Sequence, residues 1–372
     1  MRMPLVLLFF SILLGNCREP YQPPVAKAQS NLLVVDAFLD GTEKSCTVVL
    51  SRSQDISDTD TVTMERNAKI QLADSKGNIY VLTEMKDGNY SVSNVTIDTQ
   101  IKYQLRIQTK EKKYQSNFVE IKNTPPIDDV TWKENDQGLQ FYVSTHDDEK
   151  KSIYYQYRYI ETWAYIAPIE SSFEIIDGAV HVRIHDIYHC WRTVSSANIS
   201  IATSVKLSED IISNFPFYLI EKPSQKLLMR YSILVKQNTV TVDEYNYWKQ
   251  LQKNTEKLGT LFDPQPSQVL SNVQNVDNPD EPVLGYFSAG ITTSKRIFVN
   301  ASDLKGNYYS RYPVKCALDS VPIENLASSG LLLIQPYYKK TLIAPDGYLG
   351  TTVFCADCRQ YGGGTLTKPD FW

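Results

Sequence analysis

Short runs in which apolar and polar residues alternate dominate the first third of the chain. The clearest run, residues 101–108, places Tyr103, Leu105 and Ile107 on one side of a strand and polar side chains on the other. This period of two predicts a sheet with one buried face and one wet face. The strands predicted in this part of the chain are 31–39, 45–52, 68–73, 79–83, 89–93, 101–108 and 113–122.

Turn signals separate these runs at Asp40-Gly41, Lys76-Gly77-Asn78 and Asp87-Gly88-Asn89. Such residues tolerate the positive φ that tight turns between strands require. Seven short strands within about ninety residues predict an immunoglobulin-like β-sandwich over residues 31–124. Thr124-Pro125-Pro126 marks its end, because consecutive prolines stop strands and stiffen linkers.

Residues 125–372 continue the β pattern and predict a larger β-rich domain with one or two helices and a cysteine-containing C-terminal tail. A helix is predicted near 242–258, where Thr241 and Glu244 have the spacing of a capping box and Gly259 stands at the C-cap. A short second helix is predicted from about Glu209. The strands predicted here are 138–144, 153–166, 179–185, 198–203, 227–236 and 283–300. The predicted fold class is therefore mainly β.

The amino terminus has a different pattern, with Arg2 followed by an apolar run that ends at Cys17. This run is too short to span a membrane and is typical of a signal sequence. The residues before Cys17 resemble a lipobox, which predicts that 1–17 is a lipoprotein signal peptide and that Cys17 becomes the acylated, palmitate-bearing first residue. Residues 18–30, rich in proline, then form a tether. The alternative is ordinary secretion, with cleavage after Ala28.

Composition points to an ordinary globular protein: 42% of residues are hydrophobic, 22% are charged and the net charge is -4. No basic patch suggests a nucleic-acid partner. An oxidising compartment favours disulfides among the cysteines that remain beside Cys17. We expect Cys316 to bond one member of the Cys-x-x-Cys pair and Cys190 the other, with the connectivity left open. The disulfide candidates are Cys190, Cys316, Cys355 and Cys358.

Tyrosine is frequent, at 24 residues against 13 phenylalanines. Within 153–166 an aromatic row follows one long strand, and its members are the candidate ligand-binding residues: Tyr157, Tyr159, Trp163 and Tyr165. Such a row is either a stacking platform for a sugar or peptide or cross-strand packing inside a sheet.

His181, His185 and His189 recur every four residues, and on a helix they would share one side with Asp186 and Cys190. Zinc or copper uses such ligands. The histidines alternate with apolar residues, however, which favours a strand with a polar outer face. We therefore predict no metal and no cofactor.

Two further motifs carry weak chemical signals. The loop 54–67 contains Asp55, Asp58 and Asp60, which suits either calcium or an ordinary solvated loop. Ser288 lies in a glycine-flanked segment that misses the Gly-x-Ser-x-Gly spacing by one residue and has no following helix signal. No catalytic residue is predicted.

Several segments together resemble the domain-of-unknown-function 4249 family. The similarity covers nearly the whole mature chain, with its most specific block at Asn278-Pro279-Asp280-Glu281-Pro282 and the following Gly285-Tyr286-Phe287-Ser288-Ala289. The other segments are 34–36, 49–53, 248–254, 261–267, 295–298, 357–359 and 368–372. The resemblance implies a lipoprotein of the Gram-negative outer membrane that serves beside a TonB-dependent receptor, and it supplies no catalytic residues.

Together these observations lead us to expect a non-enzymatic, lipid-anchored outer-membrane protein that assists a TonB-dependent receptor in ligand capture or uptake. The face of the membrane that it occupies stays open. The alternatives are an exported hydrolase or metalloenzyme and a surface adhesin. The identity of a ligand does not follow from the sequence.

Overall fold

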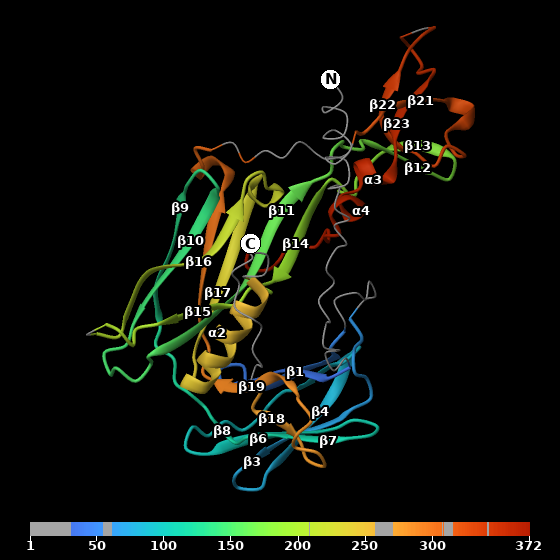
Figure 1. Ribbon diagram of the computed structural model, residues 1–372. Helices are drawn as coiled ribbons and strands as arrows, with labels where there is room; N and C mark the ends of the chain where they lie inside the picture. Colours follow the sequence, from blue (N-terminus) through green and yellow to red (C-terminus); the bar gives the residue numbers. More distant parts are fainter. Residues whose placement is uncertain are drawn as a thin grey trace, which may run out of the picture.

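The computed structural model describes residues 31–54, 62–207, 209–256, 271–306, 308, 315–340 and 342–372 (Figure 1). The chain is mainly β, with several sheets and few helices, which confirms the predicted class. The predicted signal peptide, Cys17, the tether and the acidic residues Asp55, Asp58 and Asp60 lie outside the described residues.

The N-terminal strands belong to a ten-stranded sheet that curls until it is nearly closed into a barrel. Its strands follow the order β18-β7-β6-β3-β4-β5-β2-β1-β19, and β8 pairs with β6. The strands are β1 (Leu33–Asp40), β2 (Ser45–Arg52), β3 (Lys69–Asp74), β4 (Ile79–Lys86), β5 (Asn89–Val92), β6 (Lys102–Gln108), β7 (Lys113–Ser116), β8 (Val119–Glu120), β18 (Val273–Asn275) and β19 (Leu284–Gly290).

This arrangement corrects the predicted sandwich of two separate sheets. β1 pairs with β2 on one side and, in parallel, with β19 on the other, so that Val35 lies opposite Gly285. β18 pairs with the far end of the sheet at β7. The two strands from 273–290 therefore complete a barrel, where the sequence pattern predicts a sandwich formed by residues 31–124 alone. The alternating side chains fill one interior, where Tyr103, Tyr114 and Phe287 are fully buried.

The two ends of the barrel sheet, β18 and β19, are joined through a side chain. The amide nitrogen of Asn272 donates to the carbonyl of Phe287 at 2.8 Å, and its amide oxygen accepts from the Phe287 N–H at 2.9 Å. The Asn272 carbonyl in turn accepts from the N–H of Asn117. One buried side-chain amide thus forms the hydrogen bonds that the Phe287 backbone of β19 would otherwise form with a neighbouring strand.

The second body consists of two sheets that share one core. One sheet has the order β16-β10-β9, and the other has the order β14-β11-β17-β20 with β15 paired to β11. The elements are β9 (Ile127–Glu134), β10 (Gly138–His146), β11 (Tyr154–Ile166), β14 (His189–Ser195), β15 (Ser200–Thr203), β16 (Ile211–Glu221), β17 (Arg230–Thr239), β20 (Thr293–Asn300) and the short 3-10 helices η1 (Gln225–Leu227) and η2 (Ala301–Asp303).

The short helix predicted from about Glu209 is wrong, because Ile211–Glu221 forms β16, paired antiparallel with β10. The predicted N-cap, Ser208, lies outside the described residues. Phe217 and Ile220 are buried in the shared core. Pairing with β10 and burial of these side chains outweigh a local helix-start signal.

The helix α2 (Val242–Glu256) follows the sequence prediction as far as the structure describes it. It contacts β11, β15 and β19, so it lies between the second body and the barrel (Figure 1). Its predicted C-cap, Gly259, falls outside the described residues.

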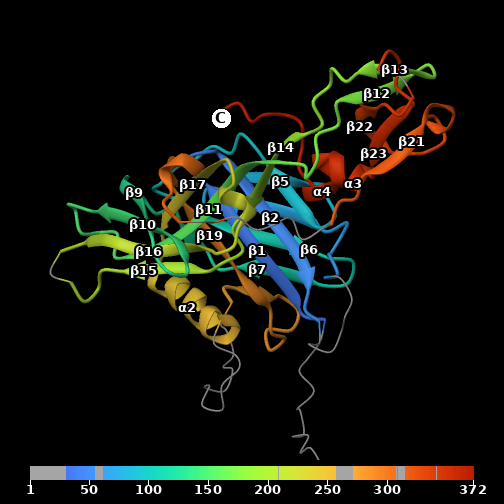
Figure 2. The ribbon, with the colours of Figure 1, turned by 90° about the horizontal axis from the view of Figure 1, so that it is seen from above.

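A small five-stranded sheet projects as an arm, on the side of the molecule away from α2 (Figure 2). Its order is β13-β12-β22-β23-β21, and its buried core contains Val321, Leu326 and Leu333. The elements of the arm and its base are β12 (Phe173–Ile176), β13 (Ala179–Val182), β21 (Asp319–Pro322), η3 (Ile323–Asn325), β22 (Leu332–Tyr337), β23 (Gly347–Thr351), α3 (Val353–Ala356) and α4 (Cys358–Gly362).

Candidate ligand-binding cleft

A cleft of about 430 Å³ opens between α2 and the closing edge of the barrel. It continues into a smaller cavity of about 180 Å³ beneath the first turn of the helix, since Asn117, Asp243, Asn272 and Tyr286 line both. The larger part is lined by Asn117, Asp243, Asn246, Tyr247, Gln250, Ser271, Asn272 and Tyr286. The cleft therefore exists only because β18, β19 and α2 meet at the point where the barrel closes.

Two tyrosines form the floor of the cleft. Tyr247 comes from α2 and Tyr286 from β19, and their ring centroids lie 5.1 Å apart. They are 7% and 9% exposed, and burial raises the pKa of both hydroxyls to about 12. Both hydroxyls are consequently neutral at physiological pH, and they line the cleft with aromatic surface and no charge.

The rim of the cleft carries polar side chains that are free to bind. Asn117, Asp243 and Asn246 are exposed, and within the described part of the chain none of their side chains has a hydrogen-bond partner. Amide groups both donate and accept, whereas the Asp243 carboxylate accepts only. This set suits a polar ligand that offers several hydroxyl or amide groups.

At the deep end of the cleft lies Glu244, a fully buried carboxyl group in the first turn of α2. Its backbone N–H donates to Thr241 Oγ1 at 3.2 Å, as one half of the predicted capping box requires. Its side chain turns inward instead and accepts from Ser288 Oγ at 2.5 Å and from Trp248 Nε1 at 3.3 Å. Burial raises the pKa of Glu244 above its ordinary value, because a charged carboxylate is costly away from water.

The hydrogen bond from Ser288 to Glu244 also concerns Ser288 as a candidate nucleophile. Its hydroxyl proton is donated to Glu244, and the side chain is buried. Neither part of the cleft is lined by a histidine or a cysteine. The Ser288 hydroxyl attaches β19 to α2 through its hydrogen bond to Glu244.

The aromatic row predicted as a ligand platform is not open to a ligand. Tyr157, Tyr159, Trp163 and Tyr165 on β11 are all buried, and all belong to the core shared by the two sheets of the second body. Tyr159, for example, packs against Tyr218 with a centroid separation of 4.3 Å. The cross-strand packing interpretation is the correct one. The residues of the actual cleft were missed because they come from α2, β19 and the segment after β7, far apart in the chain.

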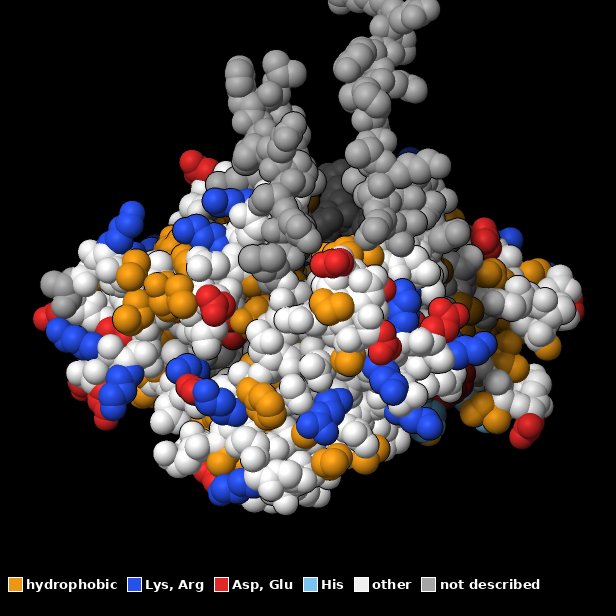
Figure 3. Space-filling view, turned by 60° about the horizontal axis from the view of Figure 1, so that its bottom comes forward, with side chains coloured by type: hydrophobic (Ala, Val, Ile, Leu, Met, Phe, Trp, Pro, Cys, Tyr) orange, Lys and Arg blue, Asp and Glu red, His pale blue; other side chains and the backbone are white. Residues whose placement is uncertain are grey.

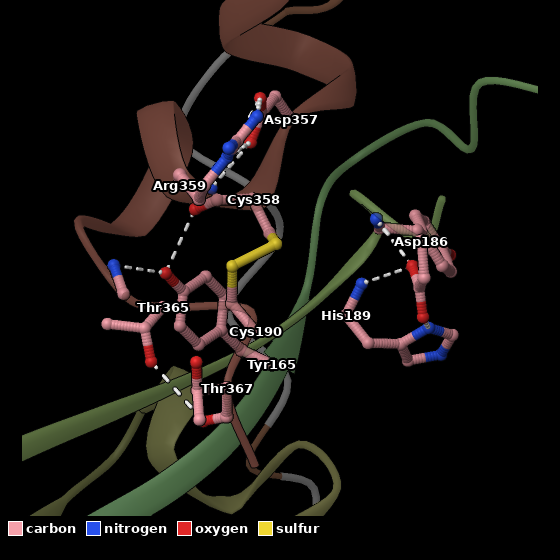
Figure 4. Close-up of a disulfide and its surroundings, with 11 residues drawn as sticks. Tyr165, Asp186, His189, Cys190, Asp357, Cys358, Arg359, Thr365 and Thr367 are labelled. Atoms are coloured by element: carbon pink, nitrogen blue, oxygen red, sulfur yellow. Dashed lines mark hydrogen bonds and ion pairs between the residues drawn. A yellow bond between two sulfur atoms is a disulfide. The ribbon is translucent and has the colours of Figure 1, made fainter. Parts of the chain in front are cut away.

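The three histidines do not form a metal site. His181 lies on β13, His189 begins β14, and His185 lies between these strands. His189 Nδ1 is 2.8 Å from Asp186 Oδ2, and the His189 backbone N–H donates to Asp186 Oδ1 at 3.1 Å (Figure 4). No group of three or more His, Cys, Asp or Glu side chains in the described ranges is placed to hold a metal ion.

The four candidate cysteines form two disulfides, Cys190–Cys358 and Cys316–Cys355. The first ties α4 to β14, beside the Tyr165 hydroxyl, which donates to the Cys358 carbonyl at 2.9 Å (Figure 4). The second holds the base of the arm. Cys46 is a free thiol inside the barrel, where burial raises its pKa to about 12.

Comparison with known protein families identifies most of the chain. The family model described as a domain of unknown function (DUF4249) matches residues 18–296, a span that runs from the segment before the barrel into β20. No curated protein matches the chain. Among the described residues, no helix has both the length and the apolar character needed to cross a membrane.

Proposed function

The chain belongs to the DUF4249 family, and from that premise we propose that it is a non-enzymatic lipoprotein of the outer membrane that captures a ligand for a TonB-dependent receptor. The N-terminal segment with Cys17 supports the lipid anchor. The family resemblance supports the receptor partner by analogy.

The observation that carries the binding role is the cleft between α2 and the barrel. Its two tyrosines and its unpartnered Asn117, Asp243 and Asn246 provide what recognition of a polar ligand needs. The buried Glu244 is already bonded to Ser288 and Trp248 and holds the helix in place beside the cleft. These contacts support a role of the cleft in binding a ligand.

The partner is tested by a pull-down of tagged protein from detergent-solubilised outer membranes, with the chains that copurify identified by mass spectrometry. We expect a TonB-dependent receptor in stoichiometric amount. A Cys17→Ser variant is the control for the anchor, and it should be lost from outer membranes that have been washed at high salt, which removes purely electrostatic attachment. Recovery of the lipoprotein alone would overturn the receptor partnership, and a fully processed Cys17→Ser protein that stays on the salt-washed membranes would overturn the anchor.

The binding role is tested by filling the cleft. Asn246→Trp places a large ring in the cleft, whereas Lys249→Trp makes the same change on α2 at a position that does not line it. Native mass spectrometry of protein recovered from cells should show a bound small molecule on the wild type and on Lys249→Trp, and none on Asn246→Trp. Equal occupancy in the two variants would remove the cleft from the proposal.

A further inference from the structure

The outer face of strands β4, β3, β6 and β7 is exposed, and its side chains lie in register. Val81, Gln71, Arg106 and Gln115 form one row across the four strands. The neighbouring row contains Lys69, Gln108 and Lys113. We call this surface the open barrel face. It is the face turned forward in Figure 3, where basic and hydrophobic side chains lie side by side.

A depression of about 300 Å³ on the open barrel face is lined with cations and amides and with no carboxylate. Its three charged residues are Lys69, Arg106 and Lys113, and none of them forms an ion pair with another described residue. By contrast, Lys102 on β6 is paired with Glu120 at 3.0 Å. In a chain of net charge -4, this face is thus a local region of uncompensated positive charge.

β4 adds an apolar stripe beside these cations. Ile79, Val81 and Met85 occupy alternate positions that point outward, and they are 51%, 62% and 71% exposed. Val81 lies directly opposite Gln71 of β3, so the stripe borders the charged rows without a gap. Unpaired cations next to exposed aliphatic side chains are the two components that bind proteins to an anionic lipid interface.

We propose that the open barrel face binds the surface of an anionic lipid membrane. The side chains of Lys69, Arg106 and Lys113 contact lipid phosphates, while Ile79, Val81 and Met85 enter the boundary between headgroups and acyl chains. The inference rests on the proposed function only for bringing the protein to a membrane, because the contact itself needs no acyl chain.

Vesicle sedimentation tests the proposal on the full mature chain with Cys17→Ser, which removes the lipid anchor. The probes are vesicles of phosphatidylcholine alone and of an equal mixture of phosphatidylcholine and phosphatidylglycerol. We expect binding to the mixed vesicles only, and weaker binding as salt increases. The double variant Lys69→Gln/Lys113→Gln should bind roughly thirtyfold more weakly, since each lysine near an anionic surface contributes about a factor of five.

The matched control is Lys102→Gln/Lys122→Gln, which removes the same charge from two lysines already paired with Glu120. It should retain most of the binding, and Val81→Ser/Met85→Ser should reduce it without changing the salt dependence. Absence of binding to the mixed vesicles would overturn the proposal, and so would equal losses in the two lysine pairs. Either result is independent of the receptor pull-down, which tests the proposed function alone.

Discussion

Ser288 on β19 donates a hydrogen bond of 2.5 Å to the carboxyl group of Glu244 on α2, and both side chains are buried. This bond attaches the helix to the strand that closes the barrel. It also holds an ionisable group in a largely buried position, where burial raises the pKa of Glu244, so the stability of this junction depends on pH.

Glu244→Gln should stabilise the protein at neutral pH. Burial raises the pKa of Glu244, so the folded state binds its proton more tightly than the unfolded state does. The stability that protonated Glu244 gives the wild-type protein is fully present below the pKa of an unfolded glutamate, about 4.3. It is lost as pH rises through the pKa of Glu244 in the folded state. Glutamine keeps an acceptor oxygen for Ser288 and Trp248 without a charge. We expect a gain on the order of 1 kcal/mol at pH 7.5 that shrinks toward pH 4, measured by thermal unfolding across this range.

The control for this prediction is Glu244→Ala, which removes the acceptor. Ser288 Oγ and Trp248 Nε1 then lose their shared partner, and stability should fall by about 1 to 3 kcal/mol at every pH. A Gln variant that is less stable than the wild type at pH 7.5 would contradict the assignment of a costly buried carboxylate.

Gly285→Ala should disrupt the joint between β1 and β19. Gly285 has φ +100°, and a Cβ atom there would lie 1.9 Å from the carbonyl oxygen of Val35. Since backbone cannot move aside as a side chain can, we expect a loss of more than about 3 kcal/mol or failure to fold. Gly290→Ala is the matched control on the same strand, because its nearest neighbour would be 3.6 Å away. Denaturant unfolding of the two variants should separate them clearly.

Asn272→Ala should weaken the closure of the barrel. It removes both hydrogen bonds to the Phe287 backbone and leaves a buried N–H and C=O without partners. We expect a loss of about 2 to 3 kcal/mol. Hydrogen exchange at the Phe287 amide should become faster, while the amides paired between β1 and β2 stay protected. Unchanged exchange at Phe287 would show that β19 is held without this amide.

Removal of the Cys316–Cys355 disulfide should loosen the arm and spare the barrel. The arm has a very small buried core, and this bond closes a segment of 39 residues near its base. By loop entropy the bond contributes about 4 kcal/mol. Limited proteolysis of a Cys316→Ser/Cys355→Ser variant should cut within 319–351 and leave a protected barrel. Cys46→Ala, which breaks no disulfide, should show the wild-type pattern.

The strand pattern and the main helix were readable from the sequence, because alternation of Tyr103, Leu105 and Ile107 and the Thr241 N-cap are local features. Features that depend on a distant strand could not be predicted in this way. Ile211–Glu221 pairs with β10, and the residues around Glu209 do not predict this pairing. The β11 aromatics face a second sheet, so a row that looks like a platform in the sequence is buried in the structure.

By itself, the sequence determined the β character of the chain, the position of α2, the cysteines that form disulfides and the family resemblance, because each depends on residues close together in the chain or on residue type. Only the tertiary structure decided that residues 273–290 close the N-terminal sheet, that Glu244 turns inward to Ser288, and that Asn117, Asp243 and Tyr286 meet in one cleft. The physical reason is that strand pairing and burial join segments that are far apart in the chain, and alternation within one strand does not specify its partner.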